Sequence, residues 1–300
     1  MPQVPIHPTL FLGIGSTGLE IIQEVEQLVL ETYGVVAEKE EIEARLPIFK
    51  YVVIETDDQN AVKAPAWMRS SAQVIHATIP DIHTVRSKVG TGGAHKDWLD
   101  ERVLRGDAYR SGAGLIRMVG RLCLRENWQT CTDVLGAAVT QMTSHRSIQA
   151  ATDFILEHSQ QVGVALPANF NPVDREARAY IVGTLCGGTC GGMYIDLAYY
   201  LRDRLRGYWP GAPQGIQPAR LYGVFSILDP PGLASAKQSR LLQRQAANCW
   251  ASLIELDYHT HPSSEYSSEM PDGSTIAFRE PPFDYSYLVT VGPKRTKDGA

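Results

Sequence analysis

Short apolar runs alternate along the chain with stretches in which apolar residues recur at helical spacing. We expect buried strands at six of these runs, because each is rich in β-branched or aromatic residues and ends at glycine, proline or polar residues. The runs are 9–13, 49–54, 74–78, 179–185, 221–228 and 285–291. After the first run, Leu19, Ile22, Val25 and Val29 repeat with a helical period, which predicts a helix that begins just after Gly18.

Helical spacing also covers about 114–160, where we expect two consecutive helices. Two further helices are predicted over 193–206 and 234–257. The repeated order of strand and then helix predicts an α/β fold, a three-layer Rossmann-like sandwich with a mostly parallel sheet. We expect residues 1–300 to form a single domain, with the polar segment 258–280 as an exposed insertion. Ligands of such folds bind at the carboxyl ends of the strands.

Composition narrows the class of protein. Charged residues make up 20% of the chain and its formal net charge is −5, which indicates a globular protein without the basic face of a nucleic-acid binder. No apolar run approaches the length that spans a bilayer. The five cysteines are scattered and odd in number, which favours free thiols. A cytoplasmic protein is therefore expected.

A glycine-rich turn follows the first predicted strand and consists of Gly13, Gly15 and Gly18 in the pattern GxGxxG. Glycines allow the backbone to approach a phosphate, and the next helix presents free N–H groups at its first turn. Ser16 and Thr17 add hydroxyl donors to this turn. Phosphate binding is the functional interpretation, and tight packing of the turn is the alternative.

A second glycine cluster joins the strand 179–185 to the following helix. It comprises Gly187, Gly188, Thr189, Cys190, Gly191 and Gly192. Four glycines in six residues are unfavourable for backbone entropy, which suggests that something approaches the main chain closely here. Two such loops at one sheet edge indicate one ligand with several phosphates, held from both sides.

With these loops the chain resembles the tubulin/FtsZ superfamily, and more specifically its divergent bacterial tubulin-like members. The cluster at 187–192 corresponds to the signature loop of that superfamily, with Cys190 at a position that is usually glycine. Four further loops match in order and rough spacing. They are the GxGxxG turn, the acidic loop with Asp57 and Asp58, a glycine–alanine loop with Gly112, Ala113 and Gly114, and a proline loop with Pro231, behind which lies Arg240.

The resemblance implies a domain that binds GTP or GDP with Mg²⁺, with Asp57 and Asp58 ordering the metal ion through water. It also implies head-to-tail self-assembly into filaments, and hydrolysis completed by an acidic loop of a neighbouring subunit, so that these 300 residues would act as a GTPase only with that loop. In the family a long core helix and a second domain follow the last strand. Neither is visible in these 300 residues, and we expect the chain to be a fragment.

Two alternatives remain open from the residues. An NAD(P)-dependent Rossmann oxidoreductase would use the GxGxxG turn, with Glu55 on the ribose, and would not need the loop at 187–192. A degenerate, non-catalytic scaffold would keep the fold without a nucleotide.

Overall fold

The computed structural model describes residues 5–33, 46–64, 73–79, 81–90, 98–104, 112–167, 169–208, 219–228 and 240–290. Its elements, in chain order, are β1 (Thr9–Ile14), α1 (Gly15–Thr32), β2 (Phe49–Glu55), α3 (Asp58–Lys63), β3 (Val74–His76), α5 (Ile82–Gly90), the 3-10 helix η1 (Glu101–Leu104), α6 (Arg117–Glu126), α7 (Trp128–Met142), α8 (His145–Gln161), β4 (Ala177–Thr184), α9 (Gly188–Arg206), β5 (Ala219–Ile227), α11 (Arg240–Thr260), β6 (Tyr266–Glu269), β7 (Thr275–Phe278) and β8 (Tyr285–Thr290).

Six strands form one parallel sheet in the order β3-β2-β1-β4-β5-β8. All six predicted strands are present, and the predicted α/β fold class is confirmed. The direction in which strands are added to the sheet reverses at β1. The strands β2 and β3 are added on one side of β1, and β4, β5 and β8 are added on its other side. A reversal of this kind opens a crevice at the carboxyl ends of the two strands.

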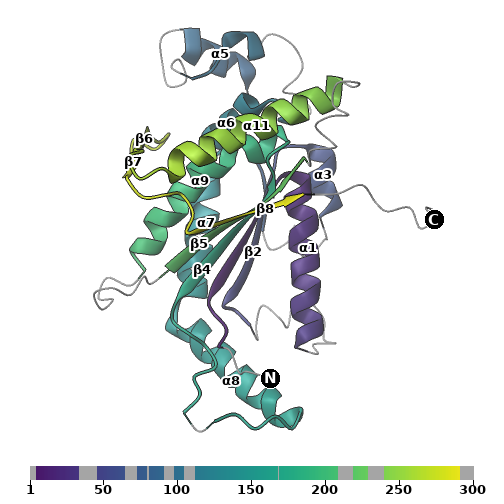
Figure 1. Cartoon of the computed structure of the whole chain (residues 1–300), viewed down its shortest axis with the longest axis vertical. Helices are drawn as coiled ribbons and strands as arrows, with labels where there is room; N and C mark the ends of the chain where they lie inside the picture. The colour runs from purple at the N-terminus through teal and green to yellow at the C-terminus, as the bar shows by residue number, and fades with distance from the viewer. Residues whose placement is uncertain are drawn as a thin grey trace, which may run out of the picture.

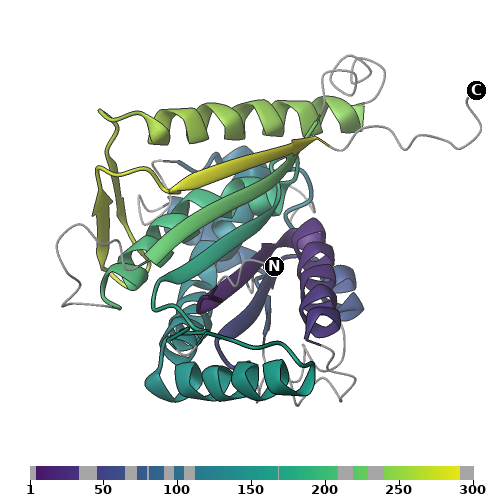
Figure 2. The same ribbon diagram turned by 60° about the horizontal axis from the view of Figure 1, so that its bottom comes forward.

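Helices cover both faces of the sheet (Figure 1). Helix α1 packs against β1, β2 and β4 on one face, whereas α7 and α9 pack on the other, and α6 and α11 pack against α9. Figure 2 shows α11 along one end of the molecule and α8 at the opposite end. Alternate residues of β1 serve the two faces: Leu10, Leu12 and Ile14 join the α7–α9 core, and Phe11 packs on the α1 side.

An aromatic ladder crosses five strands on the α1 side. Tyr51, Phe11, Tyr180, Tyr222 and Tyr285 lie in register on β2, β1, β4, β5 and β8. Their rings stack with centroid distances between 4.6 and 5.6 Å. Stacked aromatic pairs on neighbouring strands stabilise the strand register. A slip of one residue in any strand would break the ladder.

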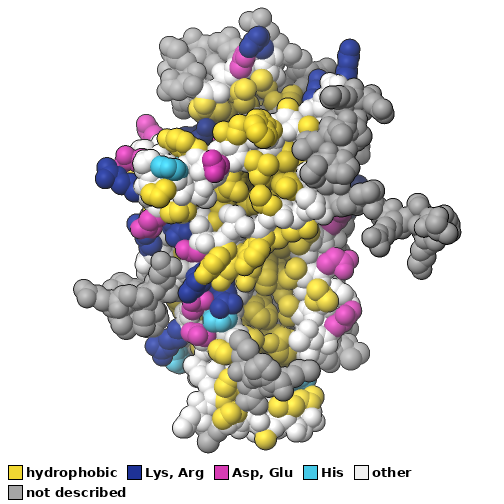
Figure 3. Space-filling view, in the orientation of Figure 1, with side chains coloured by type: hydrophobic (Ala, Val, Ile, Leu, Met, Phe, Trp, Pro, Cys, Tyr) yellow, Lys and Arg dark blue, Asp and Glu magenta, His cyan; other side chains and the backbone are white. Residues whose placement is uncertain are grey.

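The edge strand β8 carries apolar side chains at the surface. Tyr285, Tyr287, Leu288 and Val289 are each between 45% and 52% exposed. Figure 3 shows hydrophobic side chains gathered over this part of the molecule. None of the described helices has the combination of length and hydrophobicity that a membrane-spanning helix requires.

The helices that follow the two glycine clusters begin earlier than predicted. Helix α1 begins at Gly15 rather than after Gly18, and α9 begins at Gly188 rather than near Met193. The glycines in these first turns allow close packing: a Cβ at Gly18 would lie 2.9 Å from the carbonyl oxygen of Val182. These glycines therefore belong to the first turns of helices that touch neighbouring backbone.

The segment 258–280, which we predicted as an exposed insertion, has most of its residues at the surface and buries several apolar side chains. This segment completes α11 and then forms the antiparallel hairpin β6–β7. Tyr266, Ile276 and Phe278 are at most 6% exposed, and the ring of Tyr266 stacks on Tyr199 with a centroid distance of 3.9 Å. The polar residues of the segment alternate with these apolar positions, and one face of the hairpin packs on α9.

Candidate functional site

A cavity of about 320 Å³ lies at the carboxyl ends of β1, β2 and β4. Five segments contribute to its wall: the start of α1, the β2–α3 turn, residues 114–115, the start of α9 and one residue of α11. The lining residues are Ile14, Gly15, Ser16, Thr17, Glu55, Thr56, Asp57, Asn60, Gly114, Leu115, Thr184, Cys186, Gly187, Gly188, Thr189, Cys190 and Gln245.

The structure brings about half of the predicted site residues together in this cavity. Those that line it are Gly15, Ser16, Thr17, Asp57, Gly114, Gly187, Gly188, Thr189 and Cys190. Predicted residues outside the lining are Gly13, Gly18, Asp58, Gly112, Ala113, Gly191, Gly192 and Arg240. Pro231 lies outside the described residues. Several glycines of the second group pack the loops against each other, whereas Arg240 is exposed at the start of α11.

Two helix N-termini at the cavity have no side-chain cap. The N-cap residues are Ile14 for α1 and Gly187 for α9, and neither side chain can accept a hydrogen bond. Neither helix has an acidic residue in its first turn. By contrast, Asp57 accepts a hydrogen bond from the N–H of Gln59 at 2.8 Å and so caps α3. The N–H of Gly188 donates to the carbonyl oxygen of Gly114 at 2.9 Å. The other first-turn N–H groups have no side-chain cap, and helix N-termini carry partial positive charge, so the arrangement suits an anion.

Two carboxylates, Glu55 and Asp57, stand among the described residues of the lining. Glu55 is 2% exposed, and its Oε1 accepts hydrogen bonds from the N–H groups of Thr56 at 2.7 Å and Asp57 at 3.1 Å. Its Oε2 is buried and has no partner among the described residues. Burial raises the pKa of Glu55 above its ordinary value, although the two N–H groups oppose this shift.

Of the predicted metal ligands, Asp57 lines the cavity together with Glu55, whereas Asp58 is not among the lining residues. Mg²⁺ in proteins is held by one or two carboxylates together with phosphate oxygens, and Glu55 and Asp57 both line the cavity. Asp58 is directed elsewhere: its Oδ1 lies 2.9 Å from His76 Nε2, and its side chain is 74% exposed. No cluster of three potential ligands from His, Cys, Asp and Glu occurs within the described residues.

Sequence reasoning missed part of the lining. The residues it did not assign to a phosphate site are Ile14, Glu55, Thr56, Asn60, Leu115, Thr184, Cys186 and Gln245. Thr56 and Cys186 adjoin predicted loops, so proximity in sequence was the available signal. Gln245 is on α11, and no pattern in the sequence distinguishes it from the exposed polar residues of that helix.

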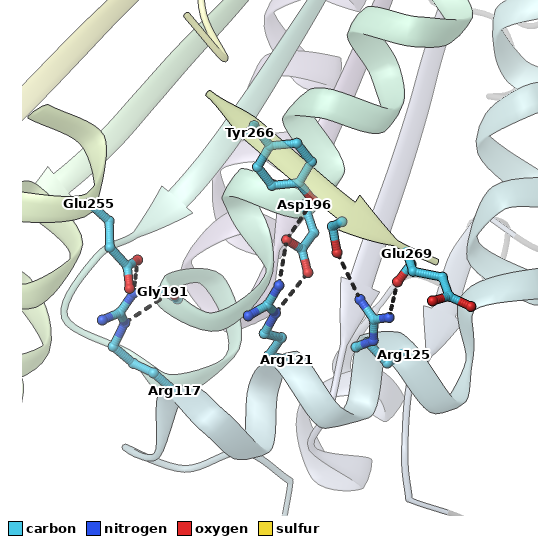
Figure 4. A network of polar contacts seen from close by, with 9 residues as sticks. Arg117, Arg121, Arg125, Gly191, Asp196, Glu255, Tyr266 and Glu269 are labelled. Atoms are coloured by element: carbon cyan, nitrogen blue, oxygen red, sulfur yellow. Dashed lines mark hydrogen bonds and ion pairs between the residues drawn. The ribbon is translucent and has the colours of Figure 1, made fainter. Parts of the chain in front are cut away.

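A row of arginines on α6 joins the helices around the site (Figure 4). Arg117 donates from Nε to the carbonyl oxygen of Gly191 at 3.0 Å and pairs through Nη2 with Glu255 of α11. This one guanidinium thus connects α6, the first turn of α9 and α11. Asn248 of α11 reinforces the connection, because its amide donates to the carbonyl oxygens of Leu115 and Cys186.

The next two arginines of the row hold the hairpin. Arg121 makes two hydrogen bonds to Asp196 of α9, at 2.9 and 3.2 Å, and Tyr266 donates to the same carboxylate at 2.9 Å. Arg125 reaches the carbonyl oxygen of Glu269 (Figure 4). Because Asp196 is 4% exposed, a bidentate partner is what makes its burial tolerable.

Cys190 is a buried structural thiol, although it stands in the first turn of α9. It is 1% exposed, and burial raises its pKa to about 12. We expect iodoacetamide at pH 8 to leave Cys190 unmodified in the native protein, because the thiolate is the reactive form. Peptide mass spectrometry checks this, with urea-unfolded protein as the positive control. Modification of Cys190 in the folded protein at a rate like that of the unfolded chain would contradict it.

A parallel sheet with glycine-rich turns at its carboxyl edge and two uncapped helix N-termini around one cavity defines an α/β protein of the kind that receives ligands at the sheet edge. The particular family is shown by the sequence, since the model of the family described as tubulin-like matches residues 10–298. The chain belongs to this family, and the prediction of a divergent tubulin-like protein is confirmed.

Solved structures with a related chain path are distant in sequence. A CetZ protein from Methanosaeta thermophila is 13% identical, with 82% of this chain and 42% of that chain covered and a TM-score of 0.39. TubZ of Clostridium botulinum phage c-st is 11% identical, with coverages of 83% and 47% and a TM-score of 0.36. CetZ2 of Haloferax volcanii, solved as a protofilament with bound GTPγS, is 12% identical, with coverages of 88% and 54% and a TM-score of 0.37. The chain therefore spans about half the length of these proteins, and a search of curated proteins found no match.

Proposed function

We propose that this chain is the guanine-nucleotide-binding part of a self-assembling, tubulin-type GTPase. The observation that carries the proposal is the convergence of two uncapped helix N-termini on one cavity at the sheet edge. Backbone N–H groups there suit the phosphates of a nucleoside diphosphate or triphosphate. The hydroxyls of Ser16, Thr17 and Thr189, which also line the cavity, add further donors.

A divalent cation belongs to the same proposal. No Lys or Arg occurs among the described residues of the lining, which contains two carboxylates instead. Phosphates beside Glu55 and Asp57 would repel them unless a cation lay between. Bound Mg²⁺ would neutralise the phosphate oxygens, and Glu55 and Asp57 are the residues that would hold it. For the whole protein we also propose GTP hydrolysis and head-to-tail assembly, and family membership is what supports this part of the proposal.

Calorimetric titration of the folded chain with GTP, GDP, ATP and NAD⁺, each with Mg²⁺, tests the proposal. We expect saturable binding of GTP and GDP, weaker ATP binding, and a loss of affinity on chelation of the metal. Preferential NAD⁺ binding would replace this proposal by the dinucleotide alternative. A folded protein that takes up none of the four ligands would leave the scaffold alternative.

A further inference from the structure

The hydroxyl of Thr56 connects two other loops of the site. Its Oγ1 accepts a hydrogen bond from the N–H of Ala113 at 3.0 Å and forms a hydroxyl–hydroxyl hydrogen bond of 2.8 Å with Thr189. Thr56 follows β2, Ala113 precedes α6, and Thr189 stands in the first turn of α9. One oxygen atom therefore joins segments that are far apart in the sequence.

The backbone around Thr56 is fixed as well. Glu55 holds its N–H, and Gly112, with a φ of +83°, lies so close that a Cβ would be 2.7 Å from the Thr56 carbonyl oxygen. On its other side, residues 112–114 accept a hydrogen bond from the N–H of Gly188 through the carbonyl oxygen of Gly114, at 2.9 Å. The 112–114 segment is thus clamped between the end of β2 and the start of α9.

Thr56 and Thr189 both line the cavity, whereas Ala113 is fully buried behind it. If the Thr56 hydroxyl were lost, the Ala113 N–H would be buried without an acceptor, a state that folded proteins relieve by moving the segment. Gly114 and Leu115, which follow Ala113 directly, are part of the cavity wall. A displaced 112–114 segment would therefore change the shape of the cavity.

We propose that Thr56 is a positioning residue of the phosphate site, whose hydroxyl sets both the Thr189 hydroxyl and the 112–114 segment for ligand binding. The identity of the ligand in this inference rests on the proposed function. The geometry rests only on the hydrogen bonds of the Thr56 hydroxyl. Thr56 acts through Ala113 and Thr189 and need not touch the phosphates itself. The hydroxyl matters to this role, and the methyl group does not.

The test compares Thr56→Val, which keeps the shape and removes the hydroxyl, with Thr56→Ser, which keeps the hydroxyl. Thr132→Val is the matched control, because Thr132 is also buried and hydrogen-bonded through its hydroxyl but lies on α7 outside the cavity lining. Two quantities are measured for each variant: amide hydrogen exchange at Ala113 without nucleotide, and the Kd for GTP with Mg²⁺.

For Thr56→Val we expect exchange at Ala113 to be at least about tenfold faster and the Kd for GTP to rise about tenfold or more. For Thr56→Ser and Thr132→Val we expect both quantities to stay within about threefold of the parent, which is the scale of a small local change. Unchanged exchange in Thr56→Val, or faster exchange with an unchanged Kd, would overturn the proposal.

Failure of the inference and failure of the proposed function give different results. If the parent protein binds no GTP, the proposed function fails, while exchange at Ala113 still decides whether Thr56 holds the segment. If Thr56→Val does not fold, the result for Thr56→Ser decides. Exchange at Ala113 and a Kd for GTP near the parent values support the role of the hydroxyl. Clearly faster exchange or a clearly higher Kd in Thr56→Ser refutes it.

Discussion

Ser16→Glu is expected to weaken nucleotide binding strongly while leaving the fold intact. Ser16 is exposed in the first turn of α1 and lines the cavity. A carboxylate there would face the phosphates, and a like-charge juxtaposition of this kind costs several kcal/mol, or roughly a 100-fold rise in Kd. A glutamate in the first turn of a helix is itself favourable by about 0.3–1 kcal/mol. Calorimetry with GTP should thus lose its signal while the Tm stays level or rises.

Gln27→Glu is the matched control for this charge change. Gln27 is exposed on the same helix and is not among the residues of the cavity lining. Its change adds the same charge and weakens one exposed hydrogen bond to Glu31. We expect the Kd for GTP to stay within about twofold, the scale of a surface change. Equal affinity of the Ser16→Glu variant and the control would place the ligand away from the start of α1.

Gly192→Ala is expected to produce the second large effect, on stability. Helices α6 and α9 cross at this point, and a Cβ on Gly192 would lie 2.2 Å from the carbonyl oxygen of Arg117 and 2.7 Å from the N of Arg121. Both neighbours are backbone atoms and cannot rotate away. Overpacking in a core costs ~3 kcal/mol at the high end of its usual range. A chain of this size would lose roughly 6–12 °C of Tm in a thermal denaturation scan.

Gly207→Ala provides the comparison at the other end of α9. Gly207 is the C-cap with ordinary helical angles, and the nearest atom to an added Cβ is the Arg204 carbonyl oxygen at 3.6 Å. We expect its Tm to remain within about 2 °C of the parent, as for other tolerated surface changes. Similar Tm losses in both variants would mean that the close α6–α9 crossing does not set the requirement for glycine at position 192.

The sheet could be predicted from sequence because its signal is local. Runs such as Tyr51–Ile54 and Ala179–Val182 are apolar without interruption, as strands buried on both faces must be. The hairpin at 266–278 is hard to recognise from the sequence because its apolar residues are separated by serines, threonines and acidic residues. Only its packing on α9 shows that Tyr266 and Phe278 belong to the core.

The candidate site was predictable where glycine had to stand at a close backbone approach, as at Gly188, where an added Cβ would lie 2.7 Å from the carbonyl oxygen of Gly114. The sequence does not predict which of two neighbouring polar residues faces the cavity. Asp57 and Asp58 are adjacent and identical in type, yet one lines the cavity and the other pairs with His76. Likewise, nothing in the sequence distinguishes the hydroxyl of Thr56 from that of any other threonine in a loop, because its partners come from two distant segments.

The adjacency of β1 and β4 has a consequence for how the protein acquires its site. The two strands pair directly although Thr9 and Arg178 are about 170 residues apart. Contacts of such long sequence separation form late, since the entropy of closing the intervening loop must be lost first. The start of α1 therefore lacks the opposite wall of its cavity until the chain beyond β4 has been made and docked. During refolding or synthesis, recovery of ligand binding would follow the arrival of β4 and α9, and a ligand added earlier would find no partly folded state to stabilise.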